Sequence, residues 1–217
     1  MSLRLGLPLI LAFAPFARAQ SPLPPTPIPA PSGGLRPPPK DSMRFVAIGD
    51  YGDQTAGSAA VAALVQALAP RFLITLGDNN YPNGAALTID ANVGQYYRQF
   101  IFPYVGTYGA GSPVNRFFPA LGNHDWVTAG ALPYLNYFTL PGNERYYDYR
   151  KGSVHFFVLD SDPNEPDGID QASVQAAWLQ AGLAASNAPF KLVYMHHAPY
   201  CSSLVHGSHG VLQWPFL

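Results

Sequence analysis

The sequence contains a single cysteine, Cys201, so no disulfide bond can form within the 217-residue chain. Charged residues make up only 12% of it, and 12 Lys and Arg nearly balance 13 Asp and Glu, which gives no basic excess for nucleic acid. Asn-x-Ser/Thr acceptors for N-glycans are also missing. A chain that is 48% hydrophobic must therefore be held together by an apolar core, or by metal.

The first part of the chain lacks a hydrophobic run of the ~20 residues that a membrane-spanning helix needs. Its apolar stretch, 5–16, is interrupted by proline, follows an arginine and precedes a small-x-small cleavage pattern. Residues 1–19 are therefore predicted to be a secretory signal peptide, and the proline-rich residues 20–42 an extended linker. We expect a secreted or periplasmic, extracytoplasmic protein that is free of the membrane after signal cleavage.

Residues 43–217 predict a globular domain in which strands and helices alternate. Strands are expected within 44–52, 71–81, 117–126 and 190–200, and an antiparallel pair within 144–152 and 153–162. Helices are expected within 56–70, 93–108 and 170–186; Ser58 is a candidate cap of the first, and the last should bury Val174, Ala177, Trp178 and Leu183. The first strand–helix–strand unit should hold its two strands parallel, which makes this an α/β domain.

Polar side chains directly follow each of the apolar strands outside the antiparallel pair. Because the carboxyl ends of strands in open α/β sheets line one crevice, we expect these residues to converge: Asp50, Asp53, Asp78, Asn79, Asn80, Tyr81, Asn123, His124, Asp125, His196 and His197. Such mixed oxygen and nitrogen donors suit iron, zinc or manganese. Two metal ions ~3.5–4 Å apart can activate water for phosphoryl transfer, and Asp78 is the natural bridging ligand.

The same stretches resemble a known family. Asp50-Tyr51-Gly52, Gly77-Asp78-Asn79-Asn80-Tyr81, Gly122-Asn123-His124-Asp125 and Val193-Tyr194-Met195-His196 resemble the first four of the five ordered motifs of the calcineurin-like metallophosphoesterases. Gly-Asp-x-x-Tyr is similar to the purple acid phosphatase branch, in which the tyrosine ligates ferric iron. The resemblance implies an α/β fold of the α-β-β-α sandwich type.

The resemblance also implies a ligand set for two metal ions, Fe³⁺ and a divalent Fe, Zn or Mn ion. One ion would be held by Asp50, Asp78 and Tyr81, and the other by Asp78, Asn123 and His196. The implied activity is the hydrolysis of phosphate monoesters of small phosphorylated substrates, of the acid phosphatase type, by a metal-bridging hydroxide.

Histidines outside the metal ligands are expected to handle the substrate. By the resemblance, His124 would contact the phosphate and protonate the leaving oxygen as the catalytic acid, and His206 would be a further substrate contact. His196 and His197 should point to opposite sides as long as the strand persists. Asp125 is left without a role.

The fifth motif of the family, Gly-His-x-His, is absent from the sequence. We therefore expect a domain that is incomplete at its C-terminus, with apolar residues such as Trp214 and Phe216 left exposed. Two alternatives stay open. One is a two-metal phosphodiesterase or nucleotidase of the same superfamily, and the other is a non-catalytic secreted module that binds metal or phosphate.

Overall fold

The computed structural model describes residues 43–216, so the predicted signal peptide and linker lie outside the described residues. Two three-stranded sheets form the centre of this region. In the first sheet all strands are parallel, in the order β1 (Phe45–Ile48), β2 (Phe72–Thr75) and β3 (Phe117–Pro119). In the second, β5 (Val154–Val158) pairs antiparallel with β4 (Tyr147–Lys151) and parallel with β6 (Phe190–Tyr194). The parallel pairing and the antiparallel hairpin are both as predicted.

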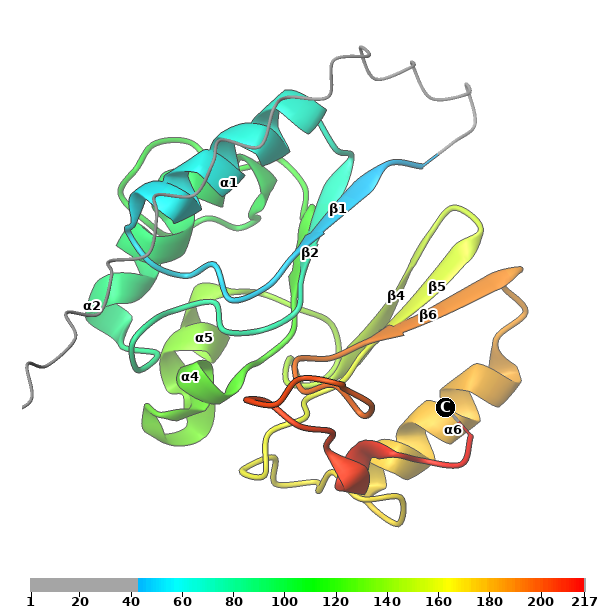
Figure 1. Cartoon of the computed structure of the whole chain (residues 1–217). Helices are drawn as coiled ribbons and strands as arrows, with labels where there is room; N and C mark the ends of the chain where they lie inside the picture. Colours follow the sequence, from blue (N-terminus) through cyan, green and yellow to red (C-terminus); the bar gives the residue numbers. More distant parts are fainter. Residues whose placement is uncertain (1–42, 217) are drawn as a thin grey trace, which may run out of the picture. The chain divides into compact units, whose positions relative to one another are not determined.

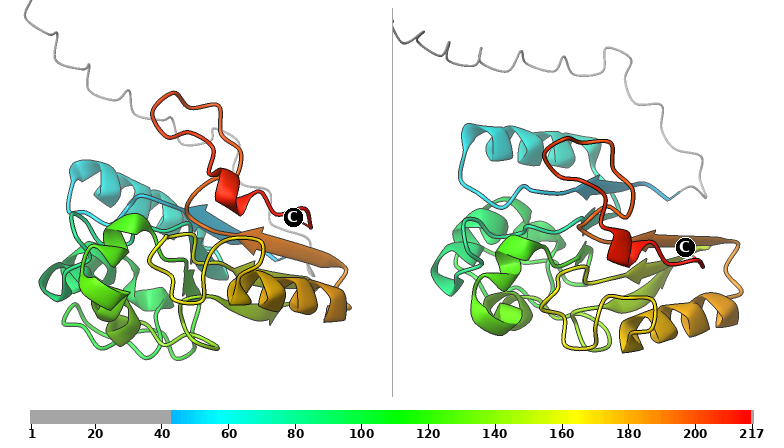
Figure 2. Two further views of the ribbon diagram at one scale, coloured as in Figure 1. Left: turned by 90° about the horizontal axis from the view of Figure 1, so that it is seen from below. Right: turned by 60° about the horizontal axis from the view of Figure 1, so that its bottom comes forward.

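Helices cover the outer faces of the two sheets (Figures 1 and 2). Helix α1 (Ala56–Leu68) lies on the side of the first sheet, and α6 (Val174–Ala185) lies against the second, where Gly182 approaches the ring of Phe157. The layers are therefore α-β-β-α. The remaining short helical segments are α2 (Ala86–Ile89), η1 (Asp90–Gly94), α3 (Gln95–Tyr97), η2 (Arg98–Phe100), α4 (Asn123–Trp126), η3 (Ala129–Ala131), α5 (Leu132–Tyr137) and η4 (Gly210–Leu212).

Aromatic side chains fill the space between the sheets. Phe72 of β2 packs edge-on against Phe156 of β5, with ring centroids 5.5 Å apart, and Phe118 of β3 stacks on Tyr149 of β4 at 3.9 Å. Every residue of β2 is buried, as expected for a central parallel strand. Within residues 43–216, each helix is too short or too polar to cross a bilayer.

Two local predictions about the helices are wrong, the second only in part. The cap of α1 is Thr55, whose Oγ1 accepts the N–H of Ser58 at 3.2 Å, so Ser58 lies inside the helix. For helix α6 the predicted face is only half right: Trp178 and Leu183 pack against the buried cluster, but Ala177 is exposed and Val174 is 62% exposed. Gln175, with Ala176 and Leu179, is buried instead. The glutamine occupies this face because its amide pairs with the backbone N–H and C=O of Asp160, at 2.8 and 2.9 Å.

The expectation that Trp214 is exposed is also wrong. Its side chain is buried, and its Nε1–H donates to the carbonyl oxygens of Ile169 and Val211 at 3.1 and 3.0 Å. It belongs to a small apolar cluster that includes Phe157 of β5 and Leu179 of α6. The C-terminal segment therefore packs on the outer layer of the second sheet.

Candidate metal centre

An aspartate lies in the tight turn after each of the strands β1 and β2. Asp50 and Asp78 have φ angles of 52° and 53°, in the left-handed region that few residues other than glycine adopt. Gly77 precedes Asp78 with φ 92°, and a Cβ there would lie 2.6 Å from that of His196. Such strained backbone is concentrated at functional sites. The turns bring both carboxylates and the imidazole of His196 together.

An oxygen cluster forms around Asp78. The hydroxyl of Tyr81 lies 2.7 Å from Oδ2 of Asp78 and 3.2 Å from Oδ1 of Asp50. Ligand atoms of Asp50, Asp78 and His196 all lie within 4.8 Å of one another. Asp78 is almost fully buried, and within residues 43–216 no Lys or Arg forms an ion pair with either aspartate. A bound cation would stabilise the charges of two close carboxylates that have no Lys or Arg partner.

His196 and Asn123 extend this cluster on the other side of Asp78. Nδ1 of His196 lies 2.8 Å from the carbonyl oxygen of Leu76 and donates to it, which directs Nε2 toward the cluster. Nε2 is 3.0 Å from Oδ1 of Asn123 and 3.6 Å from Oδ1 of Asp78. Nε2 therefore faces two oxygen atoms with a lone pair, and three acceptor atoms cannot hydrogen-bond to one another. A metal ion between them could bind all three.

The donor set fits metal ions in its chemistry as well as its geometry. Carboxylate, phenol, amide oxygen and imidazole converge, and these ligand types suit iron, zinc and manganese. Burial raises the pKa of the Tyr81 phenol, and the hydrogen bond and charge of Asp78 raise it further, so the phenol keeps its proton without a cation. A cation bound between these oxygens would favour the phenolate. The predicted ligands Asp50, Asp78, Tyr81, Asn123 and His196 are therefore brought together, while their roles remain a prediction.

His124, which is predicted to face the substrate, lies at the edge of the cluster. Its Nδ1 is 2.6 Å from the carbonyl oxygen of Pro82 and donates to it, so Nε2 is the ring atom that can give up or accept a proton. Nε2 lies 3.9 Å from Oδ2 of Asp78, and the ring packs against Tyr81 with centroids 4.4 Å apart. The backbone N–H of His124 donates to Oδ1 of Asp78 at 2.9 Å, which ties α4 to the end of β2.

Asp125 holds two of the turns around the cluster together through hydrogen bonds, a role that the sequence did not reveal. Its buried carboxylate accepts the backbone N–H of Gly122 at 2.9 Å, and the backbone and side-chain N–H groups of Asn79 at 3.1 and 2.9 Å. Burial raises the pKa of Asp125 to about 6 in spite of these donors. The side chain joins the turn after β2, which carries Asp78, to the turn after β3, which carries Asn123. The signal that could have found it is the Asp at the third position of α4, a capping position.

Other polar residues at the strand ends hold the backbone instead of facing the cluster. Asp53 accepts hydrogen bonds from the backbone and side chain of Thr55 and from the hydroxyl of Ser58, which starts α1. Asn79 bonds to Asp125, and the Nδ2 of Asn80 donates to a backbone carbonyl near α2. Asp53 and Asn80 are therefore outside the predicted metal centre although they follow the same strands as Asp50 and Asp78.

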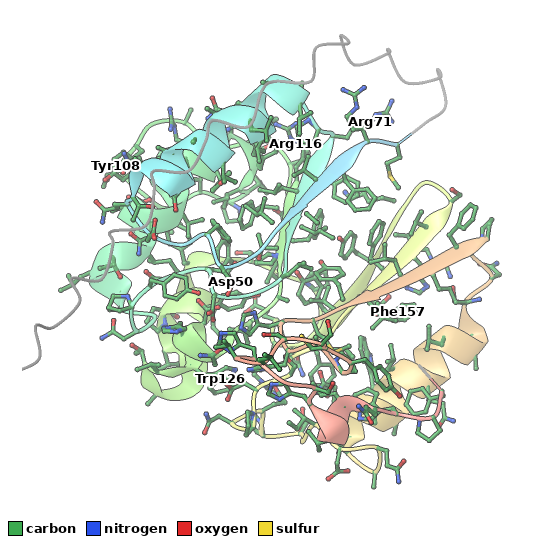
Figure 3. The ribbon with its side chains drawn as sticks, in the orientation of Figure 1. Asp50, Arg71, Tyr108, Arg116, Trp126 and Phe157 are labelled. Carbon is green, nitrogen blue, oxygen red and sulfur yellow. The ribbon has the colours of Figure 1, made fainter. Side chains whose placement is uncertain are left out.

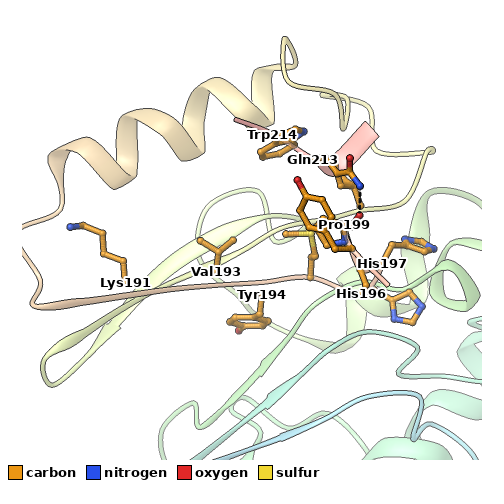
Figure 4. Close-up of a pocket in the computed structure, with 12 residues that line it drawn as sticks. Lys191, Val193, Tyr194, His196, His197, Pro199, Gln213 and Trp214 are labelled. Carbon is orange, nitrogen blue, oxygen red and sulfur yellow. Dashed lines mark hydrogen bonds between the residues drawn. The ribbon is translucent and has the colours of Figure 1, made fainter. Parts of the chain in front are cut away.

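His197 does not point away from His196, because the strand on which that prediction depended ends before both histidines. Strand β6 ends at Tyr194, before the two histidines, and the strict alternation of a strand no longer applies there. The two rings lie edge to face with centroids 4.8 Å apart, beyond the end of β6 (Figure 4). Nδ1 of His197 is 2.9 Å from the hydroxyl of Ser161, and its ring lies 4.4 Å from that of His209. Burial, followed by His196 and His209, lowers the pKa of His197.

A cavity of about 570 Å³ opens over the cluster. The structure places the predicted substrate residues His124 and His206 in its lining, and His206 is exposed. The full lining consists of Asp50, Asp78, Tyr81, Asn123, His124, His196, His197, Ala198, Cys201, His206, Gly207 and His209. The predicted ligands and the predicted acid therefore share one concave surface.

Comparison with known proteins identifies the class. The profile of the calcineurin-like phosphoesterase family matches residues 43–216, and the chain belongs to this family. A purple acid phosphatase from yellow lupin (Lupinus luteus) seeds has a similar fold, with a TM-score of 0.57 and 19% identity over 76% of this chain and 33% of that one.

Two curated relatives are tartrate-resistant acid phosphatases of type 5. The rabbit (Oryctolagus cuniculus) protein is 25% identical over 199 residues, which cover 76% of this chain and 59% of the relative. The pig (Sus scrofa) protein is 27% identical over 206 residues, which cover 78% of this chain and 57% of the relative. The similarity to acid phosphatases is therefore distant, and the chain spans less than two thirds of the relatives that it matches.

Proposed function

We propose that this protein hydrolyses phosphate monoesters of small molecules, in the manner of an acid phosphatase, at a centre of two metal ions. The observation that carries the proposal is the convergence of Asp50, Asp78 and Tyr81 with Asn123 and His196 on one cavity. The distant similarity to the rabbit and pig acid phosphatases favours this chemistry over other phosphoester hydrolysis. The proposed ions are Fe³⁺ and a divalent Fe, Zn or Mn ion.

The roles proposed for the ligands follow from their positions. Asp78 lies between the two groups and would contact both ions; Asp50 and Tyr81 would complete one group, and Asn123 and His196 the other. Bound metal ions lower the pKa of water and clamp the oxygens of the phosphoryl group. Leu76 orients His196 through its carbonyl oxygen, which keeps Nε2 directed into the cluster.

His124 is proposed to protonate the leaving oxygen of the ester. Its Nδ1 is held by the carbonyl of Pro82, so the transferable proton resides on Nε2, which faces the cavity. Tyr81 packs against the ring and restricts its orientation. A positioned acid of this kind contributes ~10²–10⁴-fold to a rate. His124→Asn should therefore lower kcat within that range while the metal content stays the same.

The ligand assignment can be tested with two aspartates that follow the same strand. Asp50→Asn removes a proposed ligand, whereas Asp53→Asn changes a residue whose side chain bonds only to the start of α1. Elemental analysis and hydrolysis of phenyl phosphate by the full chain, loaded with iron and zinc, would be measured for both variants. We expect loss of metal and activity in the first variant only; equal losses would refute the assignment. Full metal occupancy without hydrolysis would refute the proposed activity.

Export also remains part of the proposal, since residues 1–19 lie outside the described residues. It would be supported by an N-terminal residue of Gln20 in protein recovered outside the cytoplasm. Intact Met1 in that protein would contradict cleavage at this position.

A further inference from the structure

Basic side chains are absent from the cavity over the proposed metal centre. Among residues 43–216, its lining contains no Lys and no Arg, and the groups on it that could carry positive charge are imidazoles. Asp50 and Asp78 contribute negative charge to the same surface. An anionic ligand in this cavity therefore has bound metal as its main source of positive charge.

The arginines next to the first sheet lie at the amino ends of its strands, whereas the cavity lies beyond the carboxyl ends. Arg44, Arg71 and Arg116 directly precede β1, β2 and β3, whereas the site follows the strands at their carboxyl ends. A four-residue strand is ~13 Å long, so these charges are more than a Debye length away at physiological salt. Figure 3 shows Arg71 and Arg116 near one edge of the molecule, away from Asp50.

In the second sheet, too, most basic residues lie at the end away from the cavity. Arg150 and Lys151 lie at the end of β4, beside the turn of the β4–β5 hairpin. Lys191 lies at the start of β6, which pairs with the start of β5, and Figure 4 shows it far from His196. Arg145 lies nearer the site end, but it is bound to Glu165 and Asp167 at 2.9 and 3.0 Å. Arg98 donates to the carbonyl of Gln95 in α3 and is outside the cavity lining.

The loop 198–209 forms one wall of the cavity and is closed by its own hydrogen bonds. The N–H of His209 donates to the carbonyl of Ala198 at 3.1 Å. The hydroxyl of Ser208 accepts the N–H of Cys201 at 2.8 Å and lies 3.2 Å from the carbonyl of the same residue. In Figure 2 the loop stands out from the body of the domain. These bonds give the loop a defined shape over the opening.

The tip of this loop is apolar and lies directly before His206. Ser203 shapes the tip, because its Oγ accepts the N–H groups of Val205 and His206, both at 3.1 Å. Leu204 is fully exposed and Val205 is 82% exposed. Cys201 and His206, which flank this tip in the chain, both line the cavity, so the tip adjoins the lining although Leu204 and Val205 are not part of it. Apolar side chains that gather on the surface can mark a ligand-binding groove.

We propose that the cavity selects esters that carry a single phosphate on an apolar organic group, and that Leu204 and Val205 contact that group. This inference rests on the proposed function. A second phosphate would have to lose water beside an apolar loop tip without a basic side chain to replace that water, which disfavours its binding. An apolar group would instead cover side chains that are otherwise left in water.

The test compares two ligands that cannot be hydrolysed and that differ in one charged group. Benzenephosphonate and benzene-1,4-bisphosphonate would be titrated into the metal-loaded full chain by calorimetry. We expect the bisphosphonate to bind about fivefold more weakly, a difference of ~1 kcal/mol. Leu204→Arg should strengthen binding of the bisphosphonate about three- to fivefold, the effect of an exposed ion pair of ~0.7–1 kcal/mol.

The matched control is Leu87→Arg, which adds the same charge at another exposed leucine, on α2 and outside the cavity lining. It should leave both affinities unchanged. The inference is overturned if the bisphosphonate binds the unaltered chain as tightly as the monophosphonate, if Leu87→Arg acts like Leu204→Arg, or if neither ligand binds. Hydrolysis of phenyl phosphate is measured separately: binding without turnover would contradict the proposed function and leave the selectivity standing.

Discussion

Asp125→Asn is the substitution that most directly tests how the centre is held in place. Oδ2 of Asp125 lies 2.9 Å from the N–H of Gly122 and 2.9 Å from Nδ2 of Asn79, and the backbone N–H of Asn79 is shared between Oδ1 at 3.1 Å and Oδ2 at 3.2 Å. An asparagine can keep one oxygen among these donors. Its amide NH₂ then replaces the other oxygen and faces the N–H of Asn79, donor against donor.

The expected cost follows from these contacts. A buried donor left without an acceptor costs ~1–3 kcal/mol, and the NH₂ of an asparagine at position 125 would be such a donor. We expect Asp125→Asn to lower the free energy of unfolding by roughly 1–3 kcal/mol below the pKa of Asp125, and by less above it, where the buried charge already costs stability. Because the turns that carry Asp78 and Asn123 lose their common anchor, metal affinity should also fall by ~10–100-fold.

The assay separates general destabilisation from loss of the site. Unfolding would be followed in urea at about pH 5, below the pKa of about 6 of Asp125, because the raised pKa means that the buried charge costs stability at higher pH. Zinc affinity would be measured at neutral pH by competition with a chromophoric chelator. Asp90→Asn is the matched control. Its carboxylate accepts hydrogen bonds from Tyr104, Tyr137 and Thr107, all outside the cavity. This variant should lose comparable stability and keep its zinc affinity.

Equal zinc affinities in the two variants would refute this reasoning. Asp125 would then be an ordinary buried residue, and the turns after β2 and β3 would hold their positions without it. An unchanged free energy of unfolding in Asp125→Asn would equally contradict the hydrogen-bond argument.

Three further predictions concern single groups. Tyr81→Phe should remove the visible absorption band of the iron-loaded chain, because the phenol oxygen is the group placed to bind iron; an unchanged spectrum would exclude Tyr81 as a ligand. Trp126→Phe should lower the free energy of unfolding by ~1–3 kcal/mol, since Nε1 donates to the buried carboxylate of Asp160 at 2.8 Å. Burial alone would raise the pKa of Asp90, but its hydrogen bonds lower it from 3.8. Its stabilisation is therefore present above that pH and is lost as the pH falls below it, so the stability difference between Asp90→Asn and the unaltered chain should shrink in acid urea titrations.

The sequence predicted which residues converge, because that information is local. Asp50, Asp78, Asn123 and His196 each come shortly after an apolar strand, and parallel strands bring their carboxyl ends to one edge. The parallel strands and the hairpin followed from apolar runs and turns of the same kind, whereas the α-β-β-α layers were implied by the family resemblance. These features depend on residues that are near one another in the chain.

Tertiary contacts decided the remainder. Asp53 follows the same strand as Asp50, yet it bonds to Thr55 and not to the centre. Gln175 occupies the buried face of α6 because the backbone of Asp160 provides both partners of its amide. Each of these outcomes depends on the exact direction of a side chain, which the spacing of residues in a sequence does not define.

Asp125 shows the same division most clearly. Its place beside His124 in the sequence gave it no role, whereas the folded chain sets it against Asn79, 46 residues earlier. The sequence by itself determined that possible metal ligands gather at the strand ends, since turns place them directly after the strands. Only the tertiary structure determined what fixes them there, because buried hydrogen bonds between distant turns form after the sheets have packed.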